Sequence, residues 1–236
     1  MNREEINSKN IQRFTLFSAE FIIALFLALS LLSLAFAIHI AFINKGHSFD
    51  NKVFEFLSGF ISPAKTNFLL FITFLGNHKF LFPVNVLLLV YFLIRKNRRF
   101  SVRISALLMT SLALLFLLKL SIQRPRPDDP LLQSVKGFSF PSGHALMSVI
   151  FYGLLIYIVW KEVSNKWMRR VVISFMIILI ILISYSRIYL RLHYASDVLA
   201  GLSVGFIWLV FSLWIIKRIE TGLRKRKERR NEIANI

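Results

Sequence analysis

The sequence predicts an all-α integral membrane protein, a bundle of six transmembrane helices with one further helix in the extracytoplasmic interface. Three observations predict it. Apolar residues make up 56% of the 236 residues, with 24 Phe, which is more apolar surface than a soluble chain of this length can bury. Apolar runs long enough to cross a bilayer recur along the chain. The net charge of +18 gathers mainly between those runs, which indicates contact with anionic lipid headgroups and not a nucleic-acid partner.

The spans follow from length, because a bilayer core of about 30 Å needs roughly 20 apolar residues as a helix. We expect the first at 14–43. The second is interrupted at Gly76, so residues 67–75 should form a short interfacial helix or an early turn of a span at 80–94. The fifth is short and should continue as a helix beyond Tyr185, where protein covers it. All six spans are expected at 14–43, 80–94, 104–122, 144–160, 171–185 and 195–216.

The loops predict the orientation and a single membrane domain, 1–236, with a basic cytoplasmic tail at 217–236. The segments on one side of the predicted spans carry 20 of the 30 Lys and Arg residues. The positive-inside rule then places both termini in the cytoplasm of a multi-pass protein of the cell (inner) membrane. Trp160, Trp167 and Trp214 fall near the cytoplasmic ends, as interface aromatics should.

An amphipathic stretch at 49–61 precedes the second span. Its apolar residues Val53, Phe54, Leu57 and Phe60 have the spacing of a helix that lies in the interface. We expect a structural lid or, as the alternative, a substrate gate.

Three clusters carry residues with chemistry, and all fall on the extracytoplasmic side. Lys119 lies inside an apolar run, where an ionisable residue indicates function, although it could also reach the outer headgroups. Seven residues later comes Arg126-Pro127, in an extended, proline-stiffened path that a rigid turn would equally explain.

The second cluster is Pro141-Ser142-Gly143-His144, which opens the fourth span. Ser is a strong helix N-cap, and a helix N-terminus binds anions through free N–H groups and its dipole. This turn could hold a phosphate, or it could be an ordinary cap followed by a histidine.

The third cluster is Ser186-Arg187, His193 and Asp197. His193 and Asp197 are four residues apart, so on a helix they would share a face and could form a hydrogen bond. Such a pair fixes the imidazole tautomer and stabilises positive charge on the ring, although a buried structural pair would look the same. Together the clusters supply what phosphoryl transfer through a covalent intermediate requires.

These motifs, Lys-x6-Arg-Pro, Pro-Ser-Gly-His and Ser-Arg-x5-His-x3-Asp, resemble the three-part signature of the type 2 phosphatidic acid phosphatase superfamily. The signature region is 119–197, and the six-span layout is similar to that of bacterial membrane lipid phosphatases of the phosphatidylglycerophosphatase B and undecaprenyl-diphosphate phosphatase types. The resemblance implies a membrane lipid phosphatase that uses no metal and no other cofactor. Its expected partners are a lipid phosphate substrate and the surrounding membrane lipids.

The resemblance also implies a role for each signature residue. His193 is the nucleophile that becomes phosphohistidine, Asp197 orients it, and His144 is the acid and base. The residues expected to bind the phosphate are Lys119, Arg126, Ser142, Gly143 and Arg187.

Five neighbours of the signature are expected to contact the headgroup or to support the site. They are Arg124, Arg191, Tyr194, Asp128 and Asp129.

Two alternatives stay open at this point. A phosphotransferase would pass the phosphate to a lipid acceptor instead of water. A small transporter or scramblase would use the cations only to guide a headgroup. The sequence does not name the lipid, since phosphatidylglycerophosphate, phosphatidate, a polyprenyl diphosphate and lipid A phosphates all present a suitable phosphate.

Overall fold

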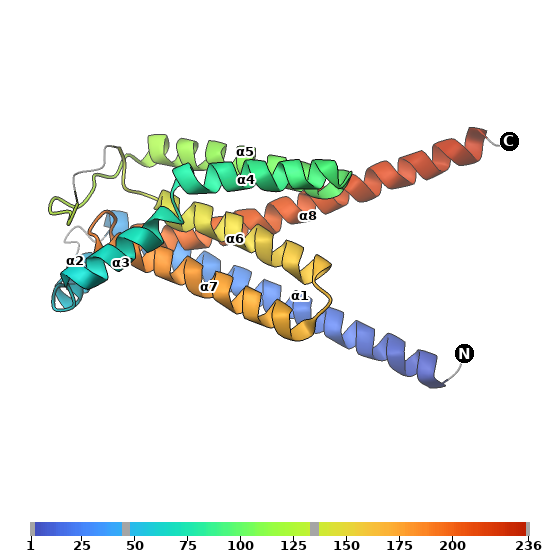
Figure 1. Cartoon of the computed structure of the whole chain (residues 1–236), viewed down its shortest axis with the longest axis horizontal. Coiled ribbons are helices and arrows are strands. Elements are labelled where there is room, and N and C mark those ends of the chain that lie inside the picture. The colour runs from blue at the N-terminus through green and yellow to red at the C-terminus, as the bar shows by residue number, and fades with distance from the viewer. Residues whose placement is uncertain (1–2, 44–47, 133–136, 235–236) are drawn as a thin grey trace.

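A bundle of long helices makes up the chain, with both termini at one end (Figure 1). The computed structural model describes residues 3–43, 48–132 and 137–234. Every regular element in those residues is helical: α1 Arg3–Ile38, continued by a π-helical turn at His39–Ile43, α2 Ser48–Ser58, α3 Pro63–Phe74, α4 His78–Ile94, α5 Arg98–Ile122, α6 Gly143–Glu162, α7 Lys166–Tyr189 and α8 Ala195–Ala234.

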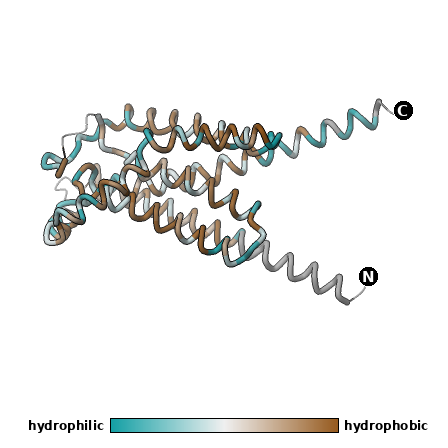
Figure 2. Tube along the Cα trace, in the orientation of Figure 1, coloured by the Kyte–Doolittle hydropathy of each residue, from teal (hydrophilic) through white to brown (hydrophobic). Residues whose placement is uncertain are grey.

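Six segments in the described residues are long and apolar enough to cross a membrane, in agreement with the six predicted spans. They are Glu20–Ile43, Pro63–Ile94, Arg98–Ile122, Gly143–Glu162, Lys166–Tyr189 and Ala195–Glu232. Apolar residues run along their lengths, whereas the last part of α8 is hydrophilic (Figure 2). The fifth span does continue past Tyr185, as expected, because α7 ends at Tyr189.

The interruption in the second predicted span is a corner between two helices. The Asn77 side chain caps α4 by accepting a hydrogen bond from Lys79 N at 2.9 Å. Upstream, Ser62 and Pro63 begin α3, a 12-residue helix that packs against α7. The early part of the predicted span is therefore a separate helix. Residues 49–61 are also helical over Ser48–Ser58, while the placement of this helix in a membrane interface stays a prediction.

Helix α6 is the centre of the bundle. In the most apolar stretch of this helix 56% of the residues are buried, whereas in that of the first span, Glu20–Ile43, only 6% are. Gly201 and Gly205 bring α8 against it: a Cβ at Gly201 would lie 2.6 Å from Ser142 O, and one at Gly205 would lie 2.9 Å from Leu146 O. Substituting either glycine would push α8 away from the beginning of α6.

We call the two ends of this bundle the site end and the termini end. The site end holds the beginning of α6, the ends of α5 and α7 and the beginning of α8. The termini end holds the opposite ends of these helices, including the exposed Trp160 and Trp167.

Candidate active site

The signature residues converge at the site end, although they come from three separate parts of the chain. Lys119 lies in the last turn of α5, Ser142 and Gly143 at the beginning of α6, and Arg187 in the last turn of α7. His193 lies in the turn between α7 and α8, and Asp197 lies in the first turn of α8.

The imidazole of His193 is buried and has two different faces. Its Nδ1 is 3.6 Å from Asp197 Oδ2 and 3.4 Å from Ser139 Oγ. Its Nε2 is 3.4 Å from Arg126 Nη1. Nδ1 therefore faces the acid, while Nε2 faces Arg126, one of the cations expected to bind the phosphate.

Burial lowers the pKa of His193 to about 4, and the hydrogen bond and charge of Asp197 only partly oppose this shift. Arg187 and Arg126 lower the pKa further. The ring is thus neutral at physiological pH. With its proton on Nδ1 toward Asp197, the lone pair is on Nε2.

His193 and Asp197 do not share one helix, although the contact that their spacing suggested exists. His193 precedes α8, and Asp197 reaches back from the first turn of that helix. The carboxylate accepts hydrogen bonds from Tyr194 N at 2.9 Å and from the Ser139 hydroxyl. This is how a residue at the third helical position caps a helix N-terminus.

Three signature cations are held by neutral oxygen atoms. Lys119 Nζ donates to Phe138 O at 2.5 Å. Arg126 donates to Gly137 O at 3.0 Å and Leu192 O at 2.8 Å, and Arg187 donates to Thr73 Oγ1 at 2.8 Å.

None of these three cations forms a salt bridge with a carboxylate within residues 3–43, 48–132 and 137–234. Burial lowers the pKa of Arg126, because desolvation disfavours its charged form. An anion placed among the three would offset that cost.

The turn that opens α6 presents unsatisfied polar atoms. Ser142 occupies the N-cap position as expected, but its hydroxyl makes no capping hydrogen bond, and its backbone N–H donates to Asp197 O at 3.0 Å. Ser142 Oγ, His144 Nε2 and Arg187 Nε are buried without a hydrogen-bond partner among the described residues. Buried polar atoms are nearly always paired, so these atoms point to a polar ligand that completes the site.

Gly143 allows a close approach between α5 and α6. A Cβ at this position would lie 3.1 Å from Leu115 Cδ2 and 3.9 Å from Lys119 Cε. A larger residue would therefore crowd Leu115 first and also contact the side chain of Lys119.

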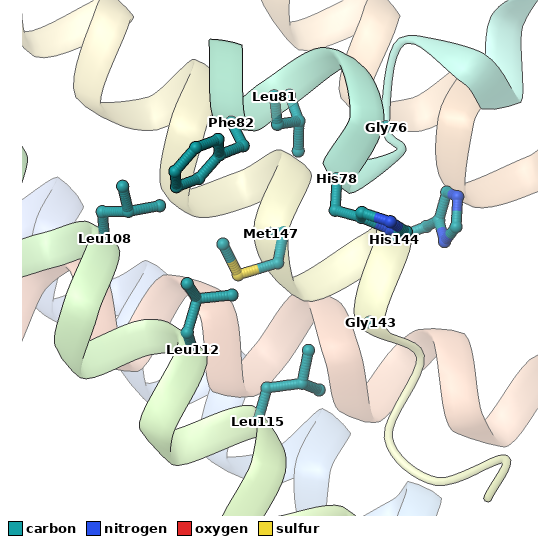
Figure 3. Close-up of a pocket in the computed structure, with 10 residues that line it drawn as sticks. All are labelled: Gly76, His78, Leu81, Phe82, Leu108, Leu112, Leu115, Gly143, His144 and Met147. Atoms are coloured by element: carbon teal, nitrogen blue, oxygen red, sulfur yellow. The ribbon is translucent and has the colours of Figure 1, made fainter. Parts of the chain in front are cut away.

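An apolar cavity of about 440 Å³ begins beside His144 (Figure 3). It lies among α4, α5 and α6. The residues that line it are Gly76, His78, Leu81, Phe82, Leu108, Leu112, Leu115, Gly143, His144 and Met147. His144 lines this apolar space and is also near enough to Arg187 and Arg126 to interact with their charges.

A second, more polar pocket of about 360 Å³ lies beside the turn before α8. Arg191, Tyr194, Asp128 and Asp129 line it together with α2, while their contact with a headgroup stays a prediction. Arg124, expected in the same group, does not line this pocket. It is 4% exposed and donates to Asp197 Oδ1 at 2.5 Å.

Sequence reasoning missed three residues of the site: Asp50, Thr73 and Ser139. Asp50 gave a signal, because it lies on the apolar stripe of the amphipathic segment, three or four residues before Val53 and Phe54. A carboxylate on such a stripe is either misplaced or paired inside the protein. Thr73 and Ser139 gave none, since one hydroxyl in an apolar helix or a loop is ordinary.

The chain is similar to known proteins in both sequence and fold. Residues 100–220 match the model of the PAP2 superfamily. The chain is 31% identical over 185 residues to phosphatidylglycerophosphatase B of Bacillus subtilis (strain 168), which covers 77% of this chain and 88% of that protein. It is 35% identical over 106 residues to an undecaprenyl-diphosphatase of Sulfolobus acidocaldarius, over 42% of this chain and 43% of that one.

Among solved structures, the fold is similar to that of a transmembrane PAP2-type phosphatidylglycerolphosphate phosphatase from Bacillus subtilis. The TM-score is 0.70 at 27% identity, covering 84% of this chain and 96% of the other. The six apolar helices and these relatives establish a multi-pass membrane protein with the phosphate-ester hydrolase character of its family. The signature, the fold and the matched residues therefore place this chain in the PAP2 superfamily, among its membrane lipid phosphatases.

Proposed function

We propose that this protein hydrolyses a phosphate monoester, or the terminal phosphate of a diphosphate, on a membrane lipid through a phosphohistidine on His193. The observation that carries the proposal is the orientation of His193. Its Nδ1 faces Asp197, while its Nε2 faces Arg126, one of three signature cations that form no salt bridge with a carboxylate in the described residues. A neutral imidazole with its lone pair toward bound phosphate is a competent nucleophile.

In the first step, His193 Nε2 attacks phosphorus as the bond from phosphorus to the lipid oxygen breaks. Lys119, Arg126 and Arg187 neutralise the non-bridging oxygens, with Ser142 Oγ and the Gly143 N–H as further donors. His144 gives the leaving lipid oxygen a proton, since a bound phosphate anion favours the protonated imidazole. Asp197 stabilises the positive charge that forms on His193.

In the second step, water attacks the phosphohistidine. His144 takes a proton from that water, the bond between nitrogen and phosphorus breaks, and inorganic phosphate leaves with His193 neutral again. The described residues bring no three carboxylate, imidazole or thiolate groups together as a metal site, so the cations are the groups available to neutralise the phosphate. Phosphate release should therefore continue in excess chelator.

The apolar cavity beside His144 suits the acyl or prenyl part of the substrate, because six apolar side chains line it and it adjoins the acid that serves the leaving group. Phosphatidylglycerophosphate is the first substrate to test, given the action named for the relative from Bacillus subtilis. A polyprenyl diphosphate is the second, from the name of the archaeal relative.

The test is phosphate release by the purified protein in detergent. The panel is phosphatidylglycerophosphate, phosphatidate, undecaprenyl diphosphate and a lipid A phosphate, with chelator present and with His193→Ala as the control. We expect inorganic phosphate from at least one lipid and none with the variant. Release of none would overturn the proposal in favour of a transporter, and phosphate found on a second lipid instead would make the protein a transferase.

We further propose that the site end faces the extracytoplasmic side. The Lys and Arg distribution supports this orientation, and the termini lie at the opposite end of the bundle (Figure 1). A cysteine at the exposed Asp129, in a chain with no native cysteine, should react with an impermeant thiol reagent in intact cells. Reaction only after lysis would reverse the assignment.

A further inference from the structure

A fully buried carboxylate on α2 lies behind the active site. Asp50 has no exposed surface. It accepts hydrogen bonds from Ser196 N at 2.9 Å, Ser196 Oγ at 2.7 Å and Arg124 Nη2 at 2.9 Å. These contacts join α2 to the first turn of α8, 146 residues further along the chain.

Arg124 connects this carboxylate to the acid behind His193. Nη2 donates to Asp50, while Nη1 donates to Asp197 Oδ1 and to Ser196 Oγ. Its guanidinium also lies 4.2 Å from the ring centre of Tyr194. The planar fork of an arginine suits this bridge, which the single charge of a lysine would not reproduce.

The two oxygens of Asp197 are thus used differently. Oδ1 accepts from Arg124, and Oδ2 faces His193 Nδ1, Ser139 and the Tyr194 N–H. Rotating this carboxylate would break both sets of contacts together. The position of Arg124 therefore fixes the oxygen that orients the nucleophile.

The charge balance of the network matters as well. A single arginine beside Asp197 would neutralise much of the negative charge that must stabilise a positively charged phosphohistidine. Because Asp50 shares the same guanidinium, the chain of Asp50, Arg124 and Asp197 keeps a net negative charge next to His193.

We propose that Asp50 and Arg124 are positioning residues, which act through Asp197 to set the geometry and charge that His193 needs. The inference rests on the phosphatase function proposed above. It makes α2 part of the active site, although Asp50 lies outside residues 100–220, which match the family model. A purely structural role is the rival account, since a buried ion pair can exist without any catalytic purpose.

The experiment compares Asp50→Asn and Arg124→Lys with the wild type in detergent, using phosphatidylglycerophosphate and the lipid of the panel that turns over fastest. Asp50→Asn places an amide donor against the Arg124 donor and removes the extra charge. We expect kcat to fall about 10- to 100-fold, as when the partner of an active-site ligand is removed. KM should stay within about threefold, because neither residue touches the phosphate. The single-turnover rate of phosphoenzyme formation should fall by the same factor as kcat.

The matched control is Glu220→Gln at the termini end. It makes the same carboxylate-to-amide change on an arginine partner, since Glu220 Oε2 is 2.8 Å from Arg103 Nη2. This variant should lower the melting temperature and leave kcat unchanged. The double variant Asp50→Asn/Arg124→Gln, in which two amides can pair without charge, should regain stability but not kcat.

Three outcomes would overturn the inference: normal kcat in Asp50→Asn, a loss confined to KM, or recovery of kcat together with stability in the double variant. If Asp50→Asn does not fold, Arg124→Lys decides, because it keeps the buried positive charge and removes only the fork. A wild type that hydrolyses no lipid on the panel, or an active His193→Ala, would instead overturn the proposed function itself.

Discussion

The two ends of the helix bundle each hold an arginine paired with a carboxylate, yet their surroundings differ. At the termini end, Arg103 is bound to Glu220 and lies over the rings of Phe100 and Tyr157. The basic residues near Glu220 along the chain, such as Lys217, are exposed to solvent. At the site end, Arg124 is paired with two carboxylates. Arg187 is equally buried, and within the described residues its side chain donates to the hydroxyl of Thr73 and to no carboxylate.

The comparison shows that the number of positive charges does not identify the functional end, because both ends are basic. The two ends differ in how their positive charges are stabilised. At the termini end the cations are exposed to water or paired with a carboxylate. In the part of the chain that the structure describes, the site end leaves Lys119, Arg126 and Arg187 without a carboxylate partner, although they are buried or half-buried. A buried charge without a counter-ion is costly, so a fold keeps it where a ligand supplies the counter-charge.

The largest effect that would break this comparison is loss of the nucleophile. His193→Ala should lower kcat by about 10⁴-fold or more, since no other group can replace the attacking nitrogen. The melting temperature should stay near that of the wild type. Phosphate release from the best lipid of the panel measures the effect, and residual turnover of a few per cent would exclude a covalent role for His193.

His144→Ala should have the next largest effect, and its size should depend on the leaving group. General acid catalysis contributes about 10²- to 10⁴-fold for a lipid alkoxide, but little for an activated aryl phosphate. In rapid-mixing measurements, the first turnover of p-nitrophenyl phosphate should stay close to the wild-type rate while lipid turnover drops. Equal losses on the two substrates would remove the acid role from His144.

A pair of lysine variants compares the two ends directly. Lys119→Gln should lower kcat/KM by about 10²- to 10³-fold, as does the loss of one preorganised group that stabilises the transition state. Lys217→Gln makes the same change on an exposed residue of α8 and should have no effect on the rate. Similar losses in the two variants would mean that the whole basic surface, and not the uncompensated cations of the site end, governs activity.

The pH dependence should be the smallest effect. The pKa of His193 is about 4 in the folded protein against 6.5 as the ordinary value, so between these limits only the unfolded chain binds the proton. The free energy of unfolding should therefore fall as the pH drops from 6.5 toward 4, and His193→Asn should flatten this slope. Thermal unfolding in detergent measures both proteins, and parallel slopes would contradict a neutral buried ring.

Much of this architecture could be predicted from the sequence, because apolar run length directly determines the spans. The Leu75–Asn77 corner could not be resolved, since a kinked helix and two helices have the same composition. The signature spacing predicted which residues meet. It did not predict why Asp197 is held in place, because Asp50 lies 147 residues away and only the folded chain brings α2 against α8.

His193 illustrates the same limit at the level of one contact. A separation of four residues suggested a helical pair, whereas the contact arises from a turn that the Asp197 side chain caps. A helical pair and a capped turn both place the two residues four positions apart. The turn forms here because Arg187 O accepts hydrogen bonds from Leu192 N and His193 N.

The most direct test of the central claim is to trap the covalent intermediate. His144→Ala should form the phosphoenzyme from p-nitrophenyl phosphate at a normal rate but hydrolyse it slowly, because the base for water is gone. After an alkaline quench, which preserves phosphohistidine, peptide mass spectrometry should find close to one phosphate per chain on His193 and none in His193→Ala/His144→Ala. Phosphate on Ser142 or Ser139 instead, or hydrolysis without any phosphorylated residue, would contradict the account.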